Sequence, residues 1–166
     1  MKTKWKWMLL IAGMLSSMSF AASASELRPF VDGSWASIVK AHAGRPTIVH
    51  FWGLSCRPCR TEMPVWGQLI KQRHGFDFVT VETDMAPSPP EQIEAFLSNA
   101  GLSKTTEAWR FADGFAEKLY FQVDPKWQGE IPMTIFIGKD GHIERHVGVE
   151  DAKAINSWLD AQNIAR

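Results

Sequence analysis

The 166-residue chain carries 18 Lys and Arg against 18 Asp and Glu, so its formal net charge is zero, and 45% of its residues are hydrophobic. This composition is ordinary for a globular protein, and the length favours a single domain with a substantial core. Because no basic block or stripe lies beyond the first few residues, nucleic acid and anionic membrane surfaces are poor candidate partners.

The N-terminus has the organisation of a secretory signal peptide. A basic start, MKTKWKW, precedes the apolar run MLLIAGMLSSMSF, and Ala22-Ser23-Ala24 matches a cleavage pattern. That run is shorter than the roughly 20 residues of a transmembrane helix, although an uncleaved anchor is the alternative. We expect residues 1–24 to be removed and residues 25–166 to form the domain. The cleaved chain has 15 basic and 18 acidic side chains, and we expect it to lie in the periplasm, without stable membrane insertion, where disulfides persist.

The rest of the chain alternates helical periodicity with short apolar, β-branched runs, and Pro and Ser mark a loop at 83–90. Ser34 is expected to cap the first helix, and Pro64 to interrupt the second. The expected elements are helix 34–44, strand 46–52, helix 56–73, strand 76–82, helix 91–101, strand 108–111, helix 114–119, strands 133–138 and 142–148 as a hairpin, and helix 150–164. This order predicts an α/β fold in which helices cover both faces of a mixed central sheet.

The stretch FWGLSCRPCRTEMP holds the only two cysteines, Cys56 and Cys59. A disulfide between them would close a very short loop and add little stability, so a structural staple is a weak interpretation. Cys56 follows a strand and should lie in the first turn of a helix, where free N–H groups and the helix dipole favour a reactive thiolate. Cys59 lies one turn further in, more shielded. Arg57 adds positive charge, and Pro58 removes an N–H that could bond a thiolate.

The run HFWGLSCRPC followed by RTEMP resembles the active site of thioredoxin-fold proteins, in particular their TlpA-like (TlpA/ResA-type) branch. The resemblance covers roughly residues 35–158, including GEIPMTIFIGKDGHI near the end. It implies a three-layer thioredoxin-like fold with a helical insertion after the second core strand. It also implies that the Ile131–Pro132 bond is cis and faces Cys56, where Pro132 would border the substrate and keep metals from the thiolates.

Four positions near the pair raise separate questions. His50 stands where many thioredoxins have a buried aspartate, so it either exchanges protons near its unperturbed pKa of ~6.5 or is simply accommodated in the core. Glu62 is a second candidate for proton handling, although a solvated carboxylate in the first turns of a helix is the favoured interpretation. Trp52 should pack beside the cysteines, either as part of the site or as ordinary core. Ser55 replaces a tryptophan common before the first cysteine, which implies a different substrate surface.

Other side chains carry weaker signals. The histidines His42, His74, His142 and His146 are scattered, and an exposed pair on one strand is the better interpretation for the last two. Zinc normally needs four ligands, and only the two cysteines are obvious. Trp109, Phe111 and Trp127 are expected to be core rather than a docking surface. We therefore expect no metal and no cofactor beyond the redox-active disulfide.

The sequence thus predicts an enzyme, a periplasmic thiol-disulfide oxidoreductase with Cys56 as nucleophile and Cys59 as resolving thiol. The resemblance implies the reducing direction, a membrane electron donor of the DsbD or CcdA kind, and exported cysteine-containing substrates such as apocytochrome c in cytochrome c maturation. A disulfide oxidase or isomerase is one alternative. A thioredoxin-fold module that binds Cu(I) without turnover is another, because two thiolates suit that soft ion.

Overall fold

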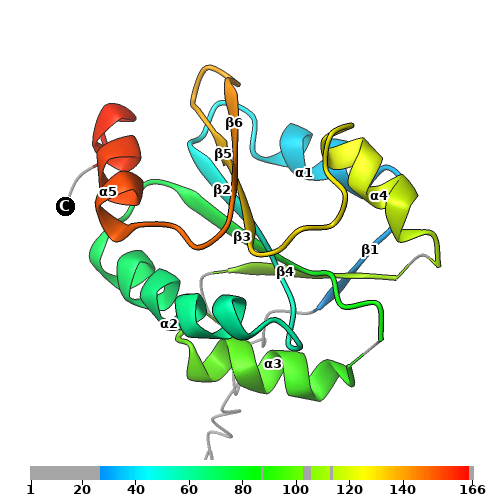
Figure 1. Ribbon diagram of the computed structural model, residues 1–166. Coiled ribbons are helices and arrows are strands. Elements are labelled where there is room, and N and C mark those ends of the chain that lie inside the picture. The colour runs from blue at the N-terminus through cyan, green and yellow to red at the C-terminus, as the bar shows by residue number, and fades with distance from the viewer. Residues whose placement is uncertain (1–26, 87, 103–105, 113, 165–166) are drawn as a thin grey trace, which may run out of the picture.

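The computed structural model describes residues 27–86, 88–102, 106–112 and 114–164, so the predicted signal peptide lies outside the described residues. The fold is a six-stranded sheet in the order β1-β4-β3-β2-β5-β6 with helices on both faces (Figure 1). The elements are β1 Arg28–Phe30, α1 Ser34–Ala41, β2 Thr47–Trp52, α2 Arg57–Gln72, β3 Asp77–Glu82, α3 Pro90–Asn99, β4 Glu107–Phe111, α4 Ala116–Val123, β5 Met133–Ile137, β6 Ile143–Val147 and α5 Ala152–Ala161. The predicted mixed α/β fold, with α3 inserted after β3, is confirmed.

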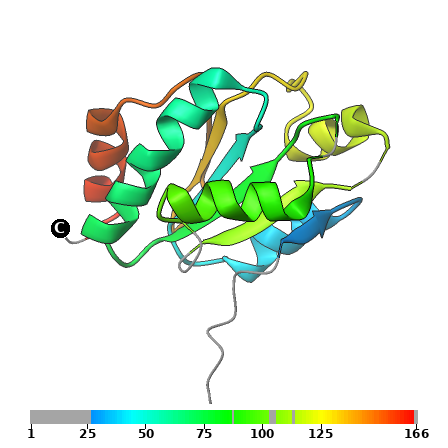
Figure 2. The same ribbon diagram turned by 90° about the horizontal axis from the view of Figure 1, so that it is seen from below.

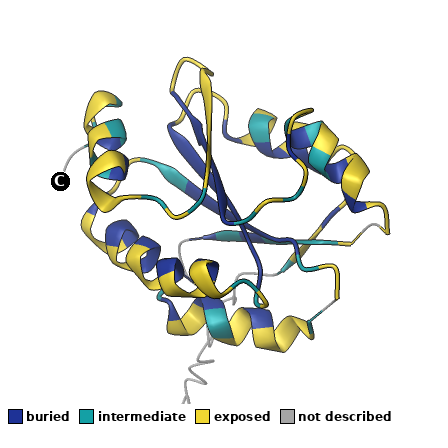
Figure 3. Ribbon diagram, viewed as in Figure 1, coloured by how far each residue is buried: buried dark blue, intermediate teal, exposed yellow. Residues whose placement is uncertain are grey.

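The sheet is parallel on one side and antiparallel on the other. Strands β1, β4, β3 and β2 run parallel, whereas β5 pairs antiparallel with β2 and β6 antiparallel with β5. The helices α2, α3 and α5 cover one face, and α1 and α4 cover the other, as the two views show (Figures 1 and 2). Figure 3 shows that the central strands are buried between them.

Each face of the sheet has its own hydrophobic core. β2 contributes side chains to both cores because alternate side chains of a strand point to opposite faces. Ile48 and Trp52 join the core under α2, α3 and α5, together with Met63, Trp66 and Leu97. Val49 and Phe51 join the core under α1 and α4. His50 falls on the first face, in line with Ile48 and Trp52, so the strand itself places this histidine beneath α2.

Two long-range contacts fix α2 in the first layer. The α-carbon of Gly67 faces the end of α3, where a Cβ would lie 1.7 Å from the Ala100 carbonyl oxygen. At the other end of α2, the guanidinium of Arg73 is almost fully buried and donates to Asp160 and to the Ile164 carbonyl at 2.7 Å each. These contacts hold α2 against both α3 and α5, and so hold the residues at its N-terminus in place.

The structure corrects several predicted boundaries. Strand β1 was not predicted, because three residues that include a proline carry no strand pattern. Helix α2 runs without interruption through Pro64, since its buried face continues past that residue to Ile70. Ser34 lies inside α1 rather than capping it, and its hydroxyl instead accepts a hydrogen bond from the Val31 N–H at 2.9 Å. Among the described residues, no helix is both apolar and long enough to span a membrane.

Candidate active site at the N-terminus of α2

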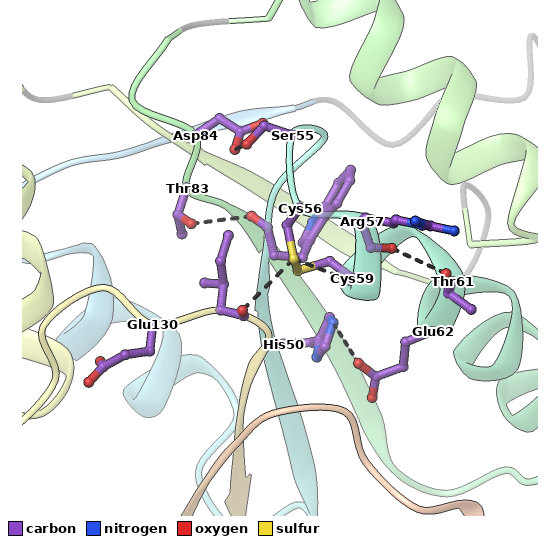
Figure 4. Close-up of a disulfide and its surroundings, with 12 residues drawn as sticks. His50, Ser55, Cys56, Arg57, Cys59, Thr61, Glu62, Thr83, Asp84 and Glu130 are labelled. Atoms are coloured by element: carbon purple, nitrogen blue, oxygen red, sulfur yellow. Dashed lines mark hydrogen bonds and ion pairs between the residues drawn. A yellow bond between two sulfur atoms is a disulfide. The ribbon is translucent and has the colours of Figure 1, made fainter.

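Cys56 and Cys59 form a disulfide at the point where β2 ends and α2 begins, with their α-carbons 5.3 Å apart (Figure 4). The two sulfurs differ in environment. Cys59 is completely buried in the core beneath α2, whereas Cys56 is only partly buried. An incoming thiol or disulfide can therefore approach Cys56, while Cys59 is reached only from within the protein.

Cys56 is the N-cap residue of α2. Its sulfur accepts a hydrogen bond from the Cys59 backbone N–H at 3.2 Å, the same interaction that a serine or aspartate makes at this position. A thiolate here would keep that bond and gain from the helix dipole. Arg57 and Pro58 occupy the first two helical positions and are exposed. Pro58 costs no intrahelical bond, because N–H groups of the first turn have no partner within a helix.

The segment before β5 approaches the disulfide from the other side. The Ile131–Pro132 peptide bond, which the resemblance to thioredoxin-fold proteins implied to be cis, is cis in the structure. The Ile131 carbonyl oxygen lies 3.8 Å from the Cys56 sulfur, and Pro132 is buried directly before the strand that pairs with β2. Because Pro132 has no N–H, the polar group that this segment presents to the sulfur is the carbonyl oxygen of Ile131.

Trp52 supports the pair from below. It is completely buried, belongs to the same core as Cys59, and stacks on Phe96 of α3 with ring centroids 5.2 Å apart. Trp52 is therefore a core residue of the cluster that also contains Cys59, and its part in the reactive site stays a prediction.

A buried polar cluster lies beneath the disulfide, on the side of α2 (Figure 4). His50 Nδ1 is 3.0 Å from the Thr134 hydroxyl, its register partner on β5, and His50 Nε2 is 3.9 Å from Glu62 Oε2. The other oxygen of Glu62 accepts a hydrogen bond from the Glu150 backbone N–H at 2.9 Å. Glu62 follows Cys59 by three residues, which places both on one face of the helix.

Burial moves the pKa values of these two groups in opposite directions. It raises the pKa of Glu62 to about 7, with the nearby Glu150 charge adding to the rise and the Glu150 N–H opposing it. It lowers the pKa of His50 to about 3, so that ring is neutral at physiological pH. The prediction that Glu62 is a solvated carboxylate is wrong, because Glu62 is only 3% exposed. Of the two interpretations of His50, the accommodated, neutral ring fits its burial.

His50 Nε2 and Glu62 Oε2 are both buried without a hydrogen-bond partner within the described part of the chain. Buried polar atoms are nearly always satisfied, so exceptions call for an explanation. If the Thr134 hydroxyl donates to Nδ1, the Nε2 of the neutral ring carries the proton and faces the carboxyl. At 3.9 Å that N–H lies beyond hydrogen-bond distance of Glu62 Oε2, so it acts on the carboxyl only through its dipole.

Substituting Glu62 by Gln should flatten the pH dependence of stability. A carboxyl whose pKa is raised from 4.5 to about 7 by folding stabilises the fold fully below pH 4.5 and loses that contribution as the pH rises through 7. Between about pH 5 and pH 8, the oxidised parent should therefore lose ~1–3 kcal/mol more unfolding free energy than Glu62→Gln. Urea denaturation at both pH values measures this difference. The control, Glu94→Gln, changes an exposed carboxyl on α3, and equal losses in all three proteins would contradict the prediction.

An acidic pair, Glu82 and Asp84, lies beside Ser55 and was not predicted. Asp84 accepts two hydrogen bonds from Ser55, one from its N–H at 2.9 Å and one from its hydroxyl at 2.5 Å. The Asp84 N–H in turn donates to Glu82 Oε1 at 3.1 Å. Burial, followed by the Asp84 charge, raises the pKa of Glu82 to about 7. The only sequence signal was that Glu82 ends, and Asp84 follows, a buried strand parallel to β2, and the carboxyl ends of these strands meet at one edge of the sheet.

The remaining candidates lie elsewhere. His74, His142 and His146 are exposed, and His42 bonds Asp77 at 2.7 Å between α1 and β3. In the described residues, no group of three or more His, Cys, Asp or Glu side chains could hold a metal ion. Of the three aromatic residues expected to be core, Trp127 is 3% exposed, and its ring centroid lies 4.8 Å from that of Phe51. Trp109 and Phe111 are half-buried and pack against the same core.

Comparisons with known proteins agree with this geometry, although no family model matches the chain. The sporulation thiol-disulfide oxidoreductase A of Bacillus subtilis is 25% identical over 174 residues, which span 92% of this chain and 93% of that protein. The thiol-disulfide oxidoreductase ResA of Geobacillus thermodenitrificans is 24% identical over 106 residues, 63% of this chain and 55% of that protein.

Solved structures share the fold. A secreted disulfide oxidoreductase of Mycobacterium tuberculosis, described as homologous to DsbE of E. coli, superposes with a TM-score of 0.58 at 21% identity, over 74% of this chain and 85% of that one. StoA of Bacillus subtilis superposes with a TM-score of 0.53 at 20% identity, over 70% of this chain and 84% of that one. The chain therefore has the thioredoxin fold and is similar to the ResA- and StoA-type thiol-disulfide oxidoreductases.

Proposed function

We propose that the protein reduces disulfides of exported proteins, with Cys56 as the nucleophile and Cys59 as the resolving thiol. The observation that carries this assignment is the difference between the two sulfurs: Cys56 is partly exposed at a helix N-terminus, and Cys59 is fully buried. Thiolates attack disulfides, so the accessible sulfur with the stabilised thiolate starts the reaction.

The reaction then follows two exchanges. The Cys56 thiolate attacks one sulfur of a substrate disulfide, forming a mixed disulfide and releasing the other substrate sulfur as a thiolate that takes up a proton. Cys59 loses its proton and attacks the Cys56 sulfur, which releases the second substrate thiol and leaves the Cys56–Cys59 disulfide. Two electrons pass from the protein to the substrate, and a dithiol donor must return them.

Glu62 is the proposed acceptor of the Cys59 proton. Its buried carboxyl lies one helical turn from Cys59, and burial raises its pKa to about 7, so it can take up and release a proton near neutral pH. The neutral ring of His50 faces the carboxyl from the β2 side, with Nε2 3.9 Å from Oε2. His50 thus acts as a positioning residue rather than as an ionising base.

The signal-peptide pattern of residues 1–24 supports export of the domain that follows it. In an oxidising compartment a reductase needs a donor, and we propose a membrane thiol protein of the DsbD or CcdA kind. The substrate class is exported proteins that carry cysteines, of which apocytochrome c is one member. The redox group is the disulfide itself, with no further cofactor.

The reduction potential of the Cys56–Cys59 pair tests the direction. We expect a value nearer the about −270 mV of thioredoxin than the about −120 mV of the oxidant DsbA. The protein is equilibrated with glutathione mixtures, free thiols are alkylated, and the oxidised fraction is counted by mass. A potential close to that of DsbA would reverse the proposed direction, making the protein an oxidase.

A further inference from the structure

The carboxylate of Asp84 lies against Ser55, the residue that precedes the nucleophile, on the side away from Glu62. In Figure 4, Ser55 and Asp84 lie above the disulfide, whereas His50 and Glu62 lie below it. Both Asp84 oxygens accept hydrogen bonds from Ser55, which directly precedes Cys56. A negative charge is thereby fixed to the backbone of the active-site loop, although the proposed reaction makes no use of it.

The loop is built to admit this carboxylate. A Cβ at Gly53 would lie 2.2 Å from Asp84 Oδ1 and 3.1 Å from the Ile131 side chain, so any residue with a side chain would displace one of them. Gly53 also accepts the Cys56 N–H through its carbonyl oxygen at 3.2 Å. Asp84 and Ile131 therefore both border the loop at Gly53, three residues before Cys56, and the Ile131 carbonyl oxygen reaches the Cys56 sulfur at 3.8 Å.

A further hydrogen bond fixes the backbone of Asp84. Its own N–H donates to the buried Glu82, which lies opposite Arg110 in the register of β3 and β4. The Arg110 guanidinium donates to the Ser88 carbonyl at 3.3 Å, and its positive charge opposes the rise in the pKa of Glu82. Among the residues that the structure describes, no cation lies within ion-pair distance of Asp84, so its charge is left uncompensated beside the loop.

We propose that Asp84 is a positioning residue whose negative charge destabilises the Cys56 thiolate and thereby makes the Cys56–Cys59 couple more reducing. The charge opposes the helix dipole and Arg57, which favour the thiolate. A couple whose reduced form is less stabilised is a weaker oxidant, as DsbA illustrates in the opposite sense. This inference rests on the proposed function, because it assigns a cause to the reducing potential.

The test compares variants that separate charge from geometry. Asp84→Asn removes the charge and keeps an acceptor for Ser55, whereas Ser55→Ala keeps the charge and removes one hydrogen bond. Asp84→Glu restores a carboxylate, and Glu94→Gln removes an exposed charge on α3. Two quantities are measured: the pH profile of Cys56 alkylation in the reduced protein, and the equilibrium constant with glutathione. The second is taken at about pH 8.5, where thiols ionise and Glu82 is ionised in every variant.

Asp84→Asn should lower the Cys56 pKa by roughly half a unit to one unit and make the protein about 3- to 10-fold more oxidising, or about 15 to 30 mV. The equilibrium constant of Asp84→Glu with glutathione should stay close to that of the parent. Ser55→Ala and Glu94→Gln should each change this constant by less than about twofold. Should Asp84→Asn not fold, Asp84→Ser removes the same charge. An unchanged potential in both charge-removing variants, or an equal change in Ser55→Ala, would overturn the inference.

These outcomes are independent of the direction test. A parent potential near that of DsbA with a clear Asp84→Asn shift would overturn the proposed direction and leave the charge effect standing. A reducing potential in the parent that does not change when the charge of Asp84 is removed would support the proposed direction and overturn the inference.

Discussion

Replacing Cys56 by Ser is expected to reduce disulfide exchange to the uncatalysed rate, a loss of more than ~1,000-fold, because removal of a nucleophile leaves no covalent route. Serine keeps the size of the residue and can still accept the Cys59 N–H at the helix N-terminus, so the fold should persist. Reduction of a model disulfide such as that of insulin, followed in the presence of excess dithiol, measures the loss.

Replacing Cys59 by Ser should have a different result. The variant keeps the accessible Cys56 thiolate but cannot resolve the mixed disulfide, so covalent adducts should accumulate and disappear on treatment with reductant. Mass spectrometry of the adducts identifies the attacked cysteine. Trapping by Cys56→Ser instead would reverse the two roles, and trapping by neither would remove the proposed mechanism.

Replacing Gly67 by Ala should destabilise the protein by more than ~3 kcal/mol or prevent folding, a loss at the upper end for single substitutions. The new Cβ would lie 1.7 Å from the Ala100 carbonyl oxygen and 2.9 Å from its carbon. Both are backbone atoms at the end of α3, so neither can rotate away. One helix must move, which opens the core around Trp66 and Leu97.

The matched control is Gly114→Ala, where a Cβ would meet nothing within 4 Å. The free energy of unfolding of that variant, measured in urea, should lie within ~0.5 kcal/mol of the parent value. A Gly67→Ala protein of parental stability would mean that α2 and α3 do not pack this closely. Because α2 contains Cys59 and begins directly after Cys56, a folded variant with a displaced α2 should also lose exchange activity, which distinguishes a shift of α2 from a local adjustment of α3.

The parts of the fold that could be predicted were those with local signals. A mostly apolar, β-branched run identified β2, and an Asp-Gly turn signal at residues 140–141 identified the hairpin of β5 and β6. Cys56 could be placed at the start of α2 because a strand, a tight turn and a helical pattern follow one another there. Strand β1 carries no such signal, since it consists of three residues stabilised by parallel pairing with β4.

The errors at the site have one physical origin. The burial of Glu62 depends on the segment before α5, which folds over it and donates the Glu150 N–H, 88 residues away in the chain. The contact between Ser55 and Asp84 likewise joins residues 29 positions apart. Helical periodicity placed Glu62 in the first turns of α2 but could not say what covers it. Polar contacts between distant segments leave no periodic pattern in a sequence.

The two outer strands of the sheet bear on how this protein meets other chains. β1 is only three residues long and contains Pro29, which lacks an N–H. β6, at the opposite edge of the sheet, exposes the charged or polar side chains of Glu144, Arg145 and His146. Short length, proline and charge are devices that discourage strands from adding to an open sheet. Under the proposed function the protein meets disulfide-bearing chains, and these edges guard it against joining them through its backbone. Its encounters are directed to Cys56, where the bond that forms is covalent and Cys59 can break it.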